Sequence, residues 1–217
     1  PVSNPPLASV VIPNWNGARH LPVCLNALRA QSYPHLEVIL VDNGSTDGSL
    51  KLLESDFPRL KAIPLSKNTG FARGNNVGIE ASSSKYIATL NNDTIVSREW
   101  LGALVAKAEA DERVGMVASK ILLGREGGEI DSTGMLFYPD GMTRQRGRGD
   151  IDDGRYDEMA EILFLSACAA LYRRSMLDEV GTFDETFFSY CEDSDLGFRG
   201  RLAGWEAVFA PKAVVRH

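Results

Sequence analysis

The chain has 217 residues, 44% of them hydrophobic and 24% charged, a balance typical of a globular protein with a sizeable core. Its formal net charge of -6 argues against a nucleic-acid partner, because phosphate backbones require clustered cations. No apolar run approaches the roughly 18 residues that cross a bilayer. The three cysteines are scattered, so we expect a reducing compartment and neither a disulfide framework nor a thiolate metal site.

The first half of the chain alternates short apolar runs with amphipathic stretches, which is typical of βαβ units and a parallel sheet. Strands are predicted at residues 9–12, 38–41, 60–65 and 86–90. Leucines and other apolar residues at helical spacing predict helices near residues 21–28, 50–57, 71–81 and 101–108. Ser45 or Thr46 is expected to cap the second helix and Ser97 the fourth. The predicted fold class is therefore α/β.

The pattern changes after Val114. Residues 130–138 and 142–145, joined by a Pro-Asp-Gly turn at 139–141, predict a β-hairpin, and further strands are expected at 162–165 and 169–172. A short helix should begin at Ser175 and end at Gly181, and a last helix should cover residues 193–202. Arginines at 144, 146 and 148 beside the acidic residues 150–153 predict a solvated, mobile loop.

We expect one domain over residues 1–217. Residues 8–113 would form a nucleotide-binding half, and residues 114–217 would complete the pocket. Since the sequence stops at His217 directly after an apolar run, we also expect the natural chain to continue beyond it.

Polar segments follow each of the four strands predicted in the first half. In an open parallel sheet, ligands bind beyond the carboxyl ends of the strands. Asn, Asp and Gly are common turn residues, so each segment alone is weak evidence, but together they predict one site for a base, a ribose or a phosphate. The segments are Asn14-Trp15-Asn16-Gly17, Asp42-Asn43-Gly44-Ser45, Lys67-Asn68-Thr69-Gly70 and Asn91-Asn92-Asp93-Thr94.

Two common nucleotide-binding motifs are missing. The segment after the first strand lacks the G-x-G-x-x-G of a simple dehydrogenase, and no Walker-type G-K-S or G-K-T occurs. Nicotinamide chemistry and the usual ATPase activity are therefore not expected.

An acidic cluster, Glu192-Asp193-Ser194-Asp195, lies at the start of the last predicted helix. Acids at a helix start complement the helix dipole and cap free N–H groups. Three acids in four residues exceed what capping needs, so we expect a functional role. Arg199 follows Asp195 by one helical turn and is expected to pair with it.

Five motifs, read together, resemble family 2 inverting glycosyltransferases with the GT-A fold. Their spelling is most like the bacterial rhamnosyltransferase-like branch, and the resemblance covers residues 9–217. It implies a Rossmann-like, mixed and mostly parallel sheet flanked by helices, with a smaller β-hairpin part on the acceptor side. The motifs are V-V-I-P-N-W-N-G, V-D-N-G-S-T-D-G-S, N-T-G-F-A-R-G-N-N-V-G-I, L-N-N-D-T and C-E-D-S-D-L-G-F-R.

The resemblance implies roles for individual residues on the donor side. Asp42 would accept a hydrogen bond from a uracil or thymine imide, and Arg73 would reach the diphosphate or the base. Asp93 would hold Mg²⁺ or Mn²⁺, with His217 as a further ligand. The family often has Asp-x-Asp where this chain has Asn91-Asn92-Asp93, one carboxylate fewer, which magnesium tolerates because it keeps waters and substrate phosphates as ligands. The implied donor-binding residues are Pro13, Asn14, Trp15, Asn16, Asp42, Asn68, Gly70, Arg73, Asn91, Asn92 and Asp93.

The resemblance also implies a reaction. Asp193 would be the general base, and Glu192 or Asp195 would orient it or contact the acceptor. A sugar would pass, with inversion, from a dTDP-rhamnose or UDP-hexose donor to a saccharide or lipid-linked saccharide. The family implies a cytoplasmic location with peripheral association at the inner face of the cell membrane. Acceptor identity would be set by the loops at 124–129 and 144–153.

Two alternatives stay open. A sugar nucleotidyltransferase should carry a glycine-rich loop with Lys or Arg after the first strand, which residues 14–19 do not supply convincingly. A nucleotide-sugar-binding module without turnover is compatible with the single acid Asp93, whereas the cluster at 192–195 argues against it. The sequence does not specify the donor sugar, the acceptor, the metal or the oligomeric state.

Overall fold

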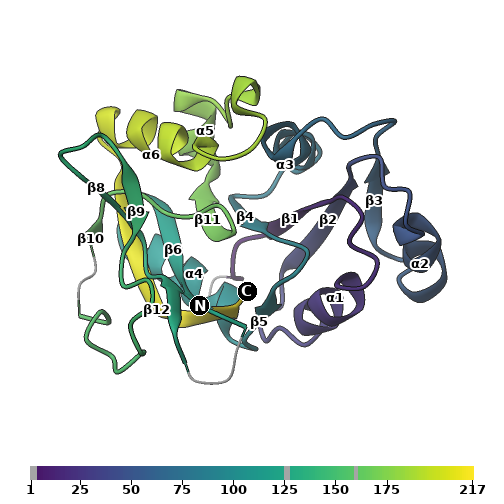
Figure 1. Ribbon diagram of the computed structural model, residues 1–217, viewed down its shortest axis with the longest axis horizontal. Helices are drawn as coiled ribbons and strands as arrows, with labels where there is room; N and C mark the ends of the chain where they lie inside the picture. Colours follow the sequence, from purple (N-terminus) through teal and green to yellow (C-terminus); the bar gives the residue numbers. More distant parts are fainter. Residues whose placement is uncertain (1–3, 125–127, 159–160) are drawn as a thin grey trace.

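The computed structural model describes residues 4–124, 128–158 and 161–217 (Figure 1). A mixed sheet forms its centre, in the order β10-β12-β6-β11-β4-β1-β2-β3. Four strands of the first half are parallel to one another, which confirms the predicted α/β class and the four predicted strands. They are β1 (Ala8–Asn14), β2 (Leu36–Asp42), β3 (Lys61–Pro64) and β4 (Tyr86–Leu90).

The second half extends this sheet with both strand directions. β11 (Ala169–Arg173) lies antiparallel between β4 and β6 (Val114–Leu122), and β12 (Glu206–Arg216) lies parallel to β6. Three short strands pair at its margins: β5 (Ile95–Val96) with β12, β7 (Ile130–Ser132) with β6, and β10 (Glu161–Ile162) with β12. β8 (Met135–Phe137) and β9 (Thr143–Gln145) form a separate antiparallel pair, which confirms the predicted hairpin.

Helices cover both faces of the sheet (Figure 1). α1 (Leu21–Arg29), α2 (Ser49–Asp56) and α4 (Trp100–Glu109) contribute to one apolar layer. α3 (Phe71–Glu80), α5 (Arg174–Val180) and α6 (Glu192–Leu202) contribute to the other. Alternation along β1 explains this: Val10 and Ile12 belong to the first layer and Val11 to the second, because successive strand side chains point to opposite faces. Among the described residues, none of these helices is long and apolar enough to span a membrane.

The predicted helix caps are wrong. α2 begins at Ser49 after Gly48, and the Ser45 hydroxyl instead accepts hydrogen bonds from the Asn16 N–H and the Asn14 side chain. Likewise α4 begins after Glu99, and Ser97 contributes its backbone carbonyl to the Trp100 N–H. In both places the serine lies in the loop before the helix, where tertiary contacts determine its role.

Two strands arise where the periodicity predicted none. All nine residues of β6 are buried, so it carries no apolar–polar alternation, and β12 contains Pro211 at an irregularity between Ala210 and Val214. The strand predicted at 162–165 is only two residues long, at 161–162. The strand predicted at 130–138 breaks at Gly134, whose φ of 123° lies in the region that favours glycine.

The loop of arginines at 144–148 is only partly solvated, contrary to prediction. Arg146 is 4% exposed and donates hydrogen bonds to the Thr133 carbonyl at 2.8 and 3.2 Å. Its guanidinium also lies 5.1 Å from the Phe209 ring centre, a cation–π contact with β12. A buried arginine thus attaches this loop to the sheet. Residues 125–127 of the proposed acceptor loop at 124–129 lie outside the described residues.

Candidate active site

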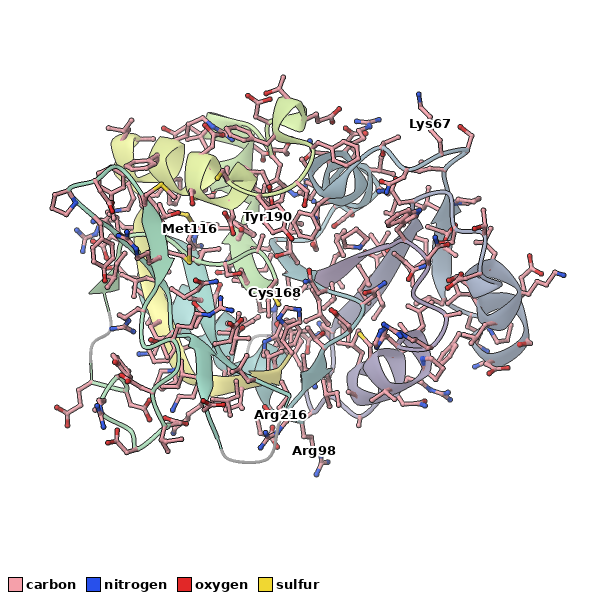
Figure 2. All side chains as sticks on the ribbon, in the orientation of Figure 1. Lys67, Arg98, Met116, Cys168, Tyr190 and Arg216 are labelled. Carbon is pink, nitrogen blue, oxygen red and sulfur yellow. The ribbon has the colours of Figure 1, made fainter. Side chains whose placement is uncertain are left out.

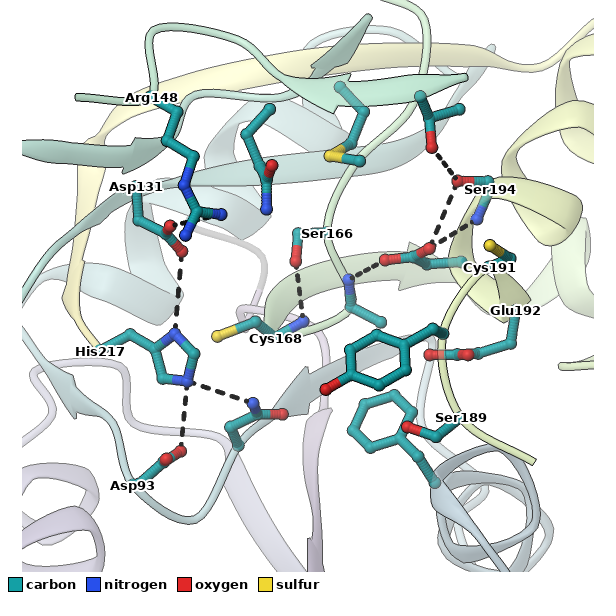
Figure 3. A pocket seen from close by; sticks show the side chains of 18 of the residues that line it. Asp93, Asp131, Arg148, Ser166, Cys168, Ser189, Cys191, Glu192, Ser194 and His217 are labelled. Atoms are coloured by element: carbon teal, nitrogen blue, oxygen red, sulfur yellow. Dashed lines mark hydrogen bonds and ion pairs between the residues drawn. The ribbon is translucent and has the colours of Figure 1, made fainter. Parts of the chain in front are cut away.

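A cavity of about 650 Å³ opens where the carboxyl ends of the central strands meet the start of α6 (Figure 3). Asp93 and Asp193, which are 100 residues apart in the chain, both line it. The single acid of the segment at 91–93 and two acids of the cluster at 192–195 therefore line one cavity from opposite halves of the sequence. Its polar and aromatic lining includes Asn91, Asp93, Asp131, Arg148, Ser166, Cys168, Tyr190, Glu192, Asp193 and His217.

One end of the cavity is built around His217. The Nε2 atom of its ring lies 3.4 Å from Asp93 Oδ1, and its Nδ1 atom lies 3.8 Å from Asp131 Oδ2. The two carboxylates, Asp131 first, raise the pKa of His217 to about 12, and the histidine lowers the pKa of Asp93. Its backbone is fixed on both sides, because its N–H donates to Leu122 and its carbonyl accepts from Gly124.

This end offers one carboxylate oxygen and one imidazole nitrogen at the same point. Among the residues described, no group of three or more His, Cys, Asp or Glu is arranged to hold a metal ion. Mg²⁺ and Mn²⁺ accept such a partial set, because waters and substrate phosphates complete their coordination. Asp93 and His217 therefore fit a divalent cation that is shared with a diphosphate.

Asp131 and Arg148 are cavity residues that the sequence did not reveal. Arg148 NH1 lies 3.4 Å from Asp131 Oδ1, and the Asp131 side chain is only 13% exposed. Asp131 sits in the three-residue strand β7, and Arg148 belongs to the loop predicted to be solvated. Neither residue lies in a motif, so only the pairing of β7 with β6 places Asp131 beside the histidine.

The other end of the cavity is built around Asp193. Its Oδ2 accepts a hydrogen bond from the Ala167 N–H at 3.2 Å, and its Oδ1 accepts one from the Ser194 N–H at 2.7 Å. Burial raises the pKa of this carboxyl, although these hydrogen bonds oppose the rise. A half-buried carboxylate with a raised pKa and a fixed orientation suits a general base.

Glu192, next to Asp193, is 5% exposed, and its Oε2 atom has no hydrogen-bond partner among the described residues. Burial raises its pKa to about 7, and the neighbouring Asp193 adds to the rise. The backbone before it is strained: Phe188, Tyr190 and Cys191 have φ angles of 56°, 72° and 70°. Strained backbone of this kind persists only where surrounding contacts stabilise it. These residues lead directly into Glu192 and Asp193, which line the cavity.

Tyr190 is the most exposed of the aromatic residues at this rim, at 85%, and it lines the cavity together with Cys168 (both labelled in Figure 2). The strained segment is held from the donor side. The Phe188 carbonyl accepts hydrogen bonds from the Phe71 and Ala72 N–H groups at the start of α3, at 2.6 and 3.3 Å. A Cβ atom on Gly70 would lie 2.5 Å from the same carbonyl oxygen, so this contact requires glycine.

The predicted donor-side segments do converge at the sheet edge. The Asn14 side-chain amide donates to Asp42 Oδ1 at 2.9 Å and accepts from the Asn92 amide at 2.7 Å. Asp42 Oδ2 accepts from the Ser45 N–H at 3.0 Å. Both Asp42 and Asn14 are fully buried, so the Asp42 carboxylate is satisfied within the protein. A uracil or thymine would have to displace one of these bonds to reach it.

The remaining predicted residues lie around this edge. Trp15 is 57% exposed, and the Asn16 side chain accepts from the Thr46 N–H. Arg73 is paired with Glu80 and Glu185, each at 3.0 Å. Of the predicted donor residues that the structure describes, only Asn91 and Asp93 line the 650 Å³ cavity; the others are Pro13, Asn14, Trp15, Asn16, Asp42, Asn68, Gly70, Arg73 and Asn92.

Asp195 differs from its two neighbours in the acidic cluster. Its Oδ2 accepts from Arg199 at 2.9 and 2.7 Å, which confirms the predicted pairing one turn along α6. It is not among the residues that line the cavity. The geometry therefore assigns the cavity to Glu192 and Asp193 and leaves Asp195 to the helix.

Comparisons with known proteins find relatives that cover all or nearly all of this chain. The chain is 30% identical over 230 residues to the O-antigen biosynthesis protein RfbC of Myxococcus xanthus, a match that covers all of this chain and 18% of that protein. It is 28% identical to the N-acetylglucosaminyl-diphospho-decaprenol L-rhamnosyltransferase of Mycobacterium tuberculosis, with 96% of this chain and 75% of the relative covered. The chain thus spans only part of each relative.

Solved structures show the same fold. The structure of TarS 1–349 from S. aureus in complex with UDP-GlcNAc matches with a TM-score of 0.72 and 20% identity, over 97% of this chain and 58% of that one. The structure of GalNAc-T7 with UDP, GalNAc and Mn²⁺ matches with a TM-score of 0.80 and 16% identity, over 99% and 44%. Both likenesses establish the predicted GT-A arrangement.

The family model described as glycosyl transferase family 2 matches residues 9–181, well over half of the chain. That span includes the four converging segments, and the last of them contributes Asn91 and Asp93 to the cavity that Glu192 and Asp193 also line. The chain belongs to glycosyl transferase family 2.

Proposed function

We propose that the protein transfers a sugar, with inversion, from a dTDP- or UDP-linked donor to a hydroxyl of a saccharide or lipid-linked saccharide. The observation that carries the proposal is the shared cavity, with Asp93 and His217 at one end and Glu192 and Asp193 at the other. An inverting transfer needs this separation, because the leaving group and the nucleophile lie on opposite sides of the anomeric carbon.

Asp193 acts as the base in this proposal. As the acceptor oxygen bonds to the anomeric carbon, the bond from that carbon to the diphosphate oxygen breaks, and the hydroxyl proton passes to a carboxylate oxygen of Asp193. Its hydrogen bonds to the Ala167 and Ser194 N–H groups hold the carboxylate in place during the transfer. A positioned base contributes roughly 10²–10⁴-fold to the rate.

A divalent cation at Asp93 and His217 would neutralise the charge that develops on the departing diphosphate. Arg148 is the one arginine among the described lining residues of the cavity, and it is paired with Asp131. A divalent cation would therefore supply most of the positive charge that a diphosphate needs in this cavity. Mg²⁺ and Mn²⁺ both suit the oxygen and nitrogen ligands present.

The proposed substrates rest on the comparisons. Two solved structures with this fold are complexes, one with UDP-GlcNAc and one with UDP, GalNAc and Mn²⁺. The Mycobacterium relative is named for transfer of L-rhamnose to a lipid-linked sugar diphosphate. We therefore place dTDP-rhamnose first and UDP-hexoses second as donors, and a lipid-linked saccharide first as acceptor. Such an acceptor would bring the protein to a membrane surface. Tyr190, exposed at the rim beside Glu192, offers a face for the acceptor sugar.

The test is release of nucleoside diphosphate from a donor panel in Mg²⁺, Mn²⁺ or EDTA, with acceptor saccharides present. We expect release from a dTDP- or UDP-linked donor that EDTA abolishes, and a product whose anomeric configuration by NMR is opposite to that of the donor. If thermal shift detects donor binding but no donor turns over with any metal, the protein is a binding module. Retained configuration would exclude the single displacement.

A further inference from the structure

We infer that Asp131 is a positioning residue for the cation site: its carboxylate orients the imidazole of His217 so that Nε2 faces the cation beside Asp93. The inference rests on the proposed function, because it concerns the same cation. It assigns a task to a buried acid that lies outside every motif of the chain.

The His217 ring lies between two carboxylates (Figure 3). Asp93 faces Nε2 at 3.4 Å, and Asp131 faces Nδ1 at 3.8 Å. The two ring nitrogens point in different directions, so the two acids approach opposite sides of one ring. Asp131 is therefore placed behind the ring, and Asp93 is placed where Nε2 and a carboxylate oxygen can share a cation.

The chemistry of imidazole gives this arrangement a consequence. A neutral histidine binds a metal through one nitrogen while the other carries the proton, and the group that faces the second nitrogen decides which is which. A carboxylate at Nδ1 stabilises the proton there, so that the Nε2 lone pair faces Asp93 and the Asn91 side-chain nitrogen, which lies 3.4 Å from it, and is available to a cation. Without Asp131, the two tautomers would compete, and the ring would lose one of its two fixed directions.

The fold fixes this distance through strands. Asp131 is the middle residue of β7. The residues on either side of it, Ile130 and Ser132, pair with Leu122 and Ile121 of β6. The His217 N–H donates to the carbonyl of that same Leu122. Both side chains therefore project from backbone that is hydrogen-bonded to one strand.

Arg148 contacts the carboxylate that faces His217. NH1 of Arg148 lies 3.4 Å from Oδ1 of Asp131, whereas the histidine faces Oδ2. The arginine thus contacts one oxygen of the Asp131 carboxylate and leaves the other oxygen toward the Nδ1 atom of His217.

The experiment is titration of UDP, or dTDP, into the full chain by calorimetry, in Mn²⁺ and in EDTA. We expect Asp131→Asn to weaken binding about 10–100-fold in Mn²⁺, the usual effect of removing such a carboxylate, and to leave binding in EDTA unchanged. Asp131→Asn combined with His217→Ala should bind no more weakly than His217→Ala alone, because both changes act on one ligand. Asp111→Asn is the control, since it removes an acid that is also paired with an arginine, Arg113.

Each outcome decides a different point. Binding by Asp131→Asn within twofold of wild type in Mn²⁺ overturns the positioning role and leaves the proposed function intact. Equal loss in Mn²⁺ and EDTA shows a purely structural acid and also overturns it. If wild type binds equally with and without metal, the cation site itself fails, and the inference fails with it. Should Asp131→Asn not fold, Asp131→Glu, which keeps the charge, replaces it in the same titrations. We expect this variant to lose part of its affinity for UDP or dTDP in Mn²⁺. Affinity equal to wild type would overturn the positioning role.

Discussion

Replacing Asp193 by asparagine separates catalysis from binding. Asparagine keeps the size of the side chain and one oxygen, so the hydrogen bond from the Ser194 N–H can persist, while its NH₂ group then faces the Ala167 N–H. An unsatisfied buried donor costs about 1–3 kcal/mol. Part of this cost is offset, because burial disfavours the charged Asp193 and raises its pKa. We expect the unfolding free energy to fall by about 1–2 kcal/mol at most.

The effect on transfer should be much larger. Loss of a general base slows the reaction about 10²–10⁴-fold, which corresponds to roughly 2.7–5.4 kcal/mol in the activation barrier. Asp193→Asn should therefore lose turnover yet bind UDP or dTDP with Mn²⁺ within about twofold of wild type. Calorimetry and diphosphate release measure the two quantities, and Asp178→Asn, an exposed acid in α5, is the control. Equal loss of binding and turnover, or turnover close to wild type, would refute the assignment of the base.

Three further changes test other parts of the structure. Burial raises the Glu192 pKa from 4.5 to about 7, so the contribution of the protonated side chain to stability is complete below pH 4.5 and is lost as the pH rises through about 7. Glu192→Gln should therefore reduce the difference in unfolding free energy between pH 5 and pH 8 by up to about 3 kcal/mol, as measured by urea unfolding. Tyr190→Ala should raise the acceptor KM and leave UDP affinity unchanged, and a change in UDP affinity alone would place the ring on the donor side. Gly78→Ala places a Cβ 2.3 Å from a Val11 methyl and should lower the unfolding free energy by about 1–3 kcal/mol. Gly102→Ala is the control: its Cβ meets nothing closer than 3.9 Å, so the change should be neutral or stabilising by up to about 1 kcal/mol. Equal effects of the two changes would contradict the close packing of Gly78 in α3 against Val11 in β1.

Patterns of local origin were predictable from the sequence. The strands β1, β2 and β4 are short apolar runs bounded by polar turns, and the edge that they share follows from the parallel arrangement. Asp93 and Asp193 could be singled out because each belongs to a motif, and both line the same cavity. Gly181 and Gly204 end or follow their helices with φ angles of 85° and 92°, as glycines at those positions should.

Features that depend on tertiary contacts were not predictable. β6 is buried on both faces, so periodicity cannot distinguish it from a helix segment. Asp131 has no sequence signal, because its neighbour His217 is 86 residues away and reaches it only through β6. Arg146 was assigned to a solvated loop on charge alone, yet Thr133 and Phe209 provide the partners that allow its burial.

The hydrogen bonds from the start of α3 to the Phe188 carbonyl join two segments that lie on different sides of the proposed reaction. Residues 68–70 lead into that helix from the proposed donor edge, and residues 188–191 lead into Glu192 and Asp193, the acids proposed for the acceptor side. If nucleotide binding shifts residues 68–70, we expect the segment before Asp193, the proposed base, to shift with them. Donor binding would in this way change the affinity for the acceptor. Such a coupling favours ordered binding, in which the nucleotide sugar binds before the acceptor.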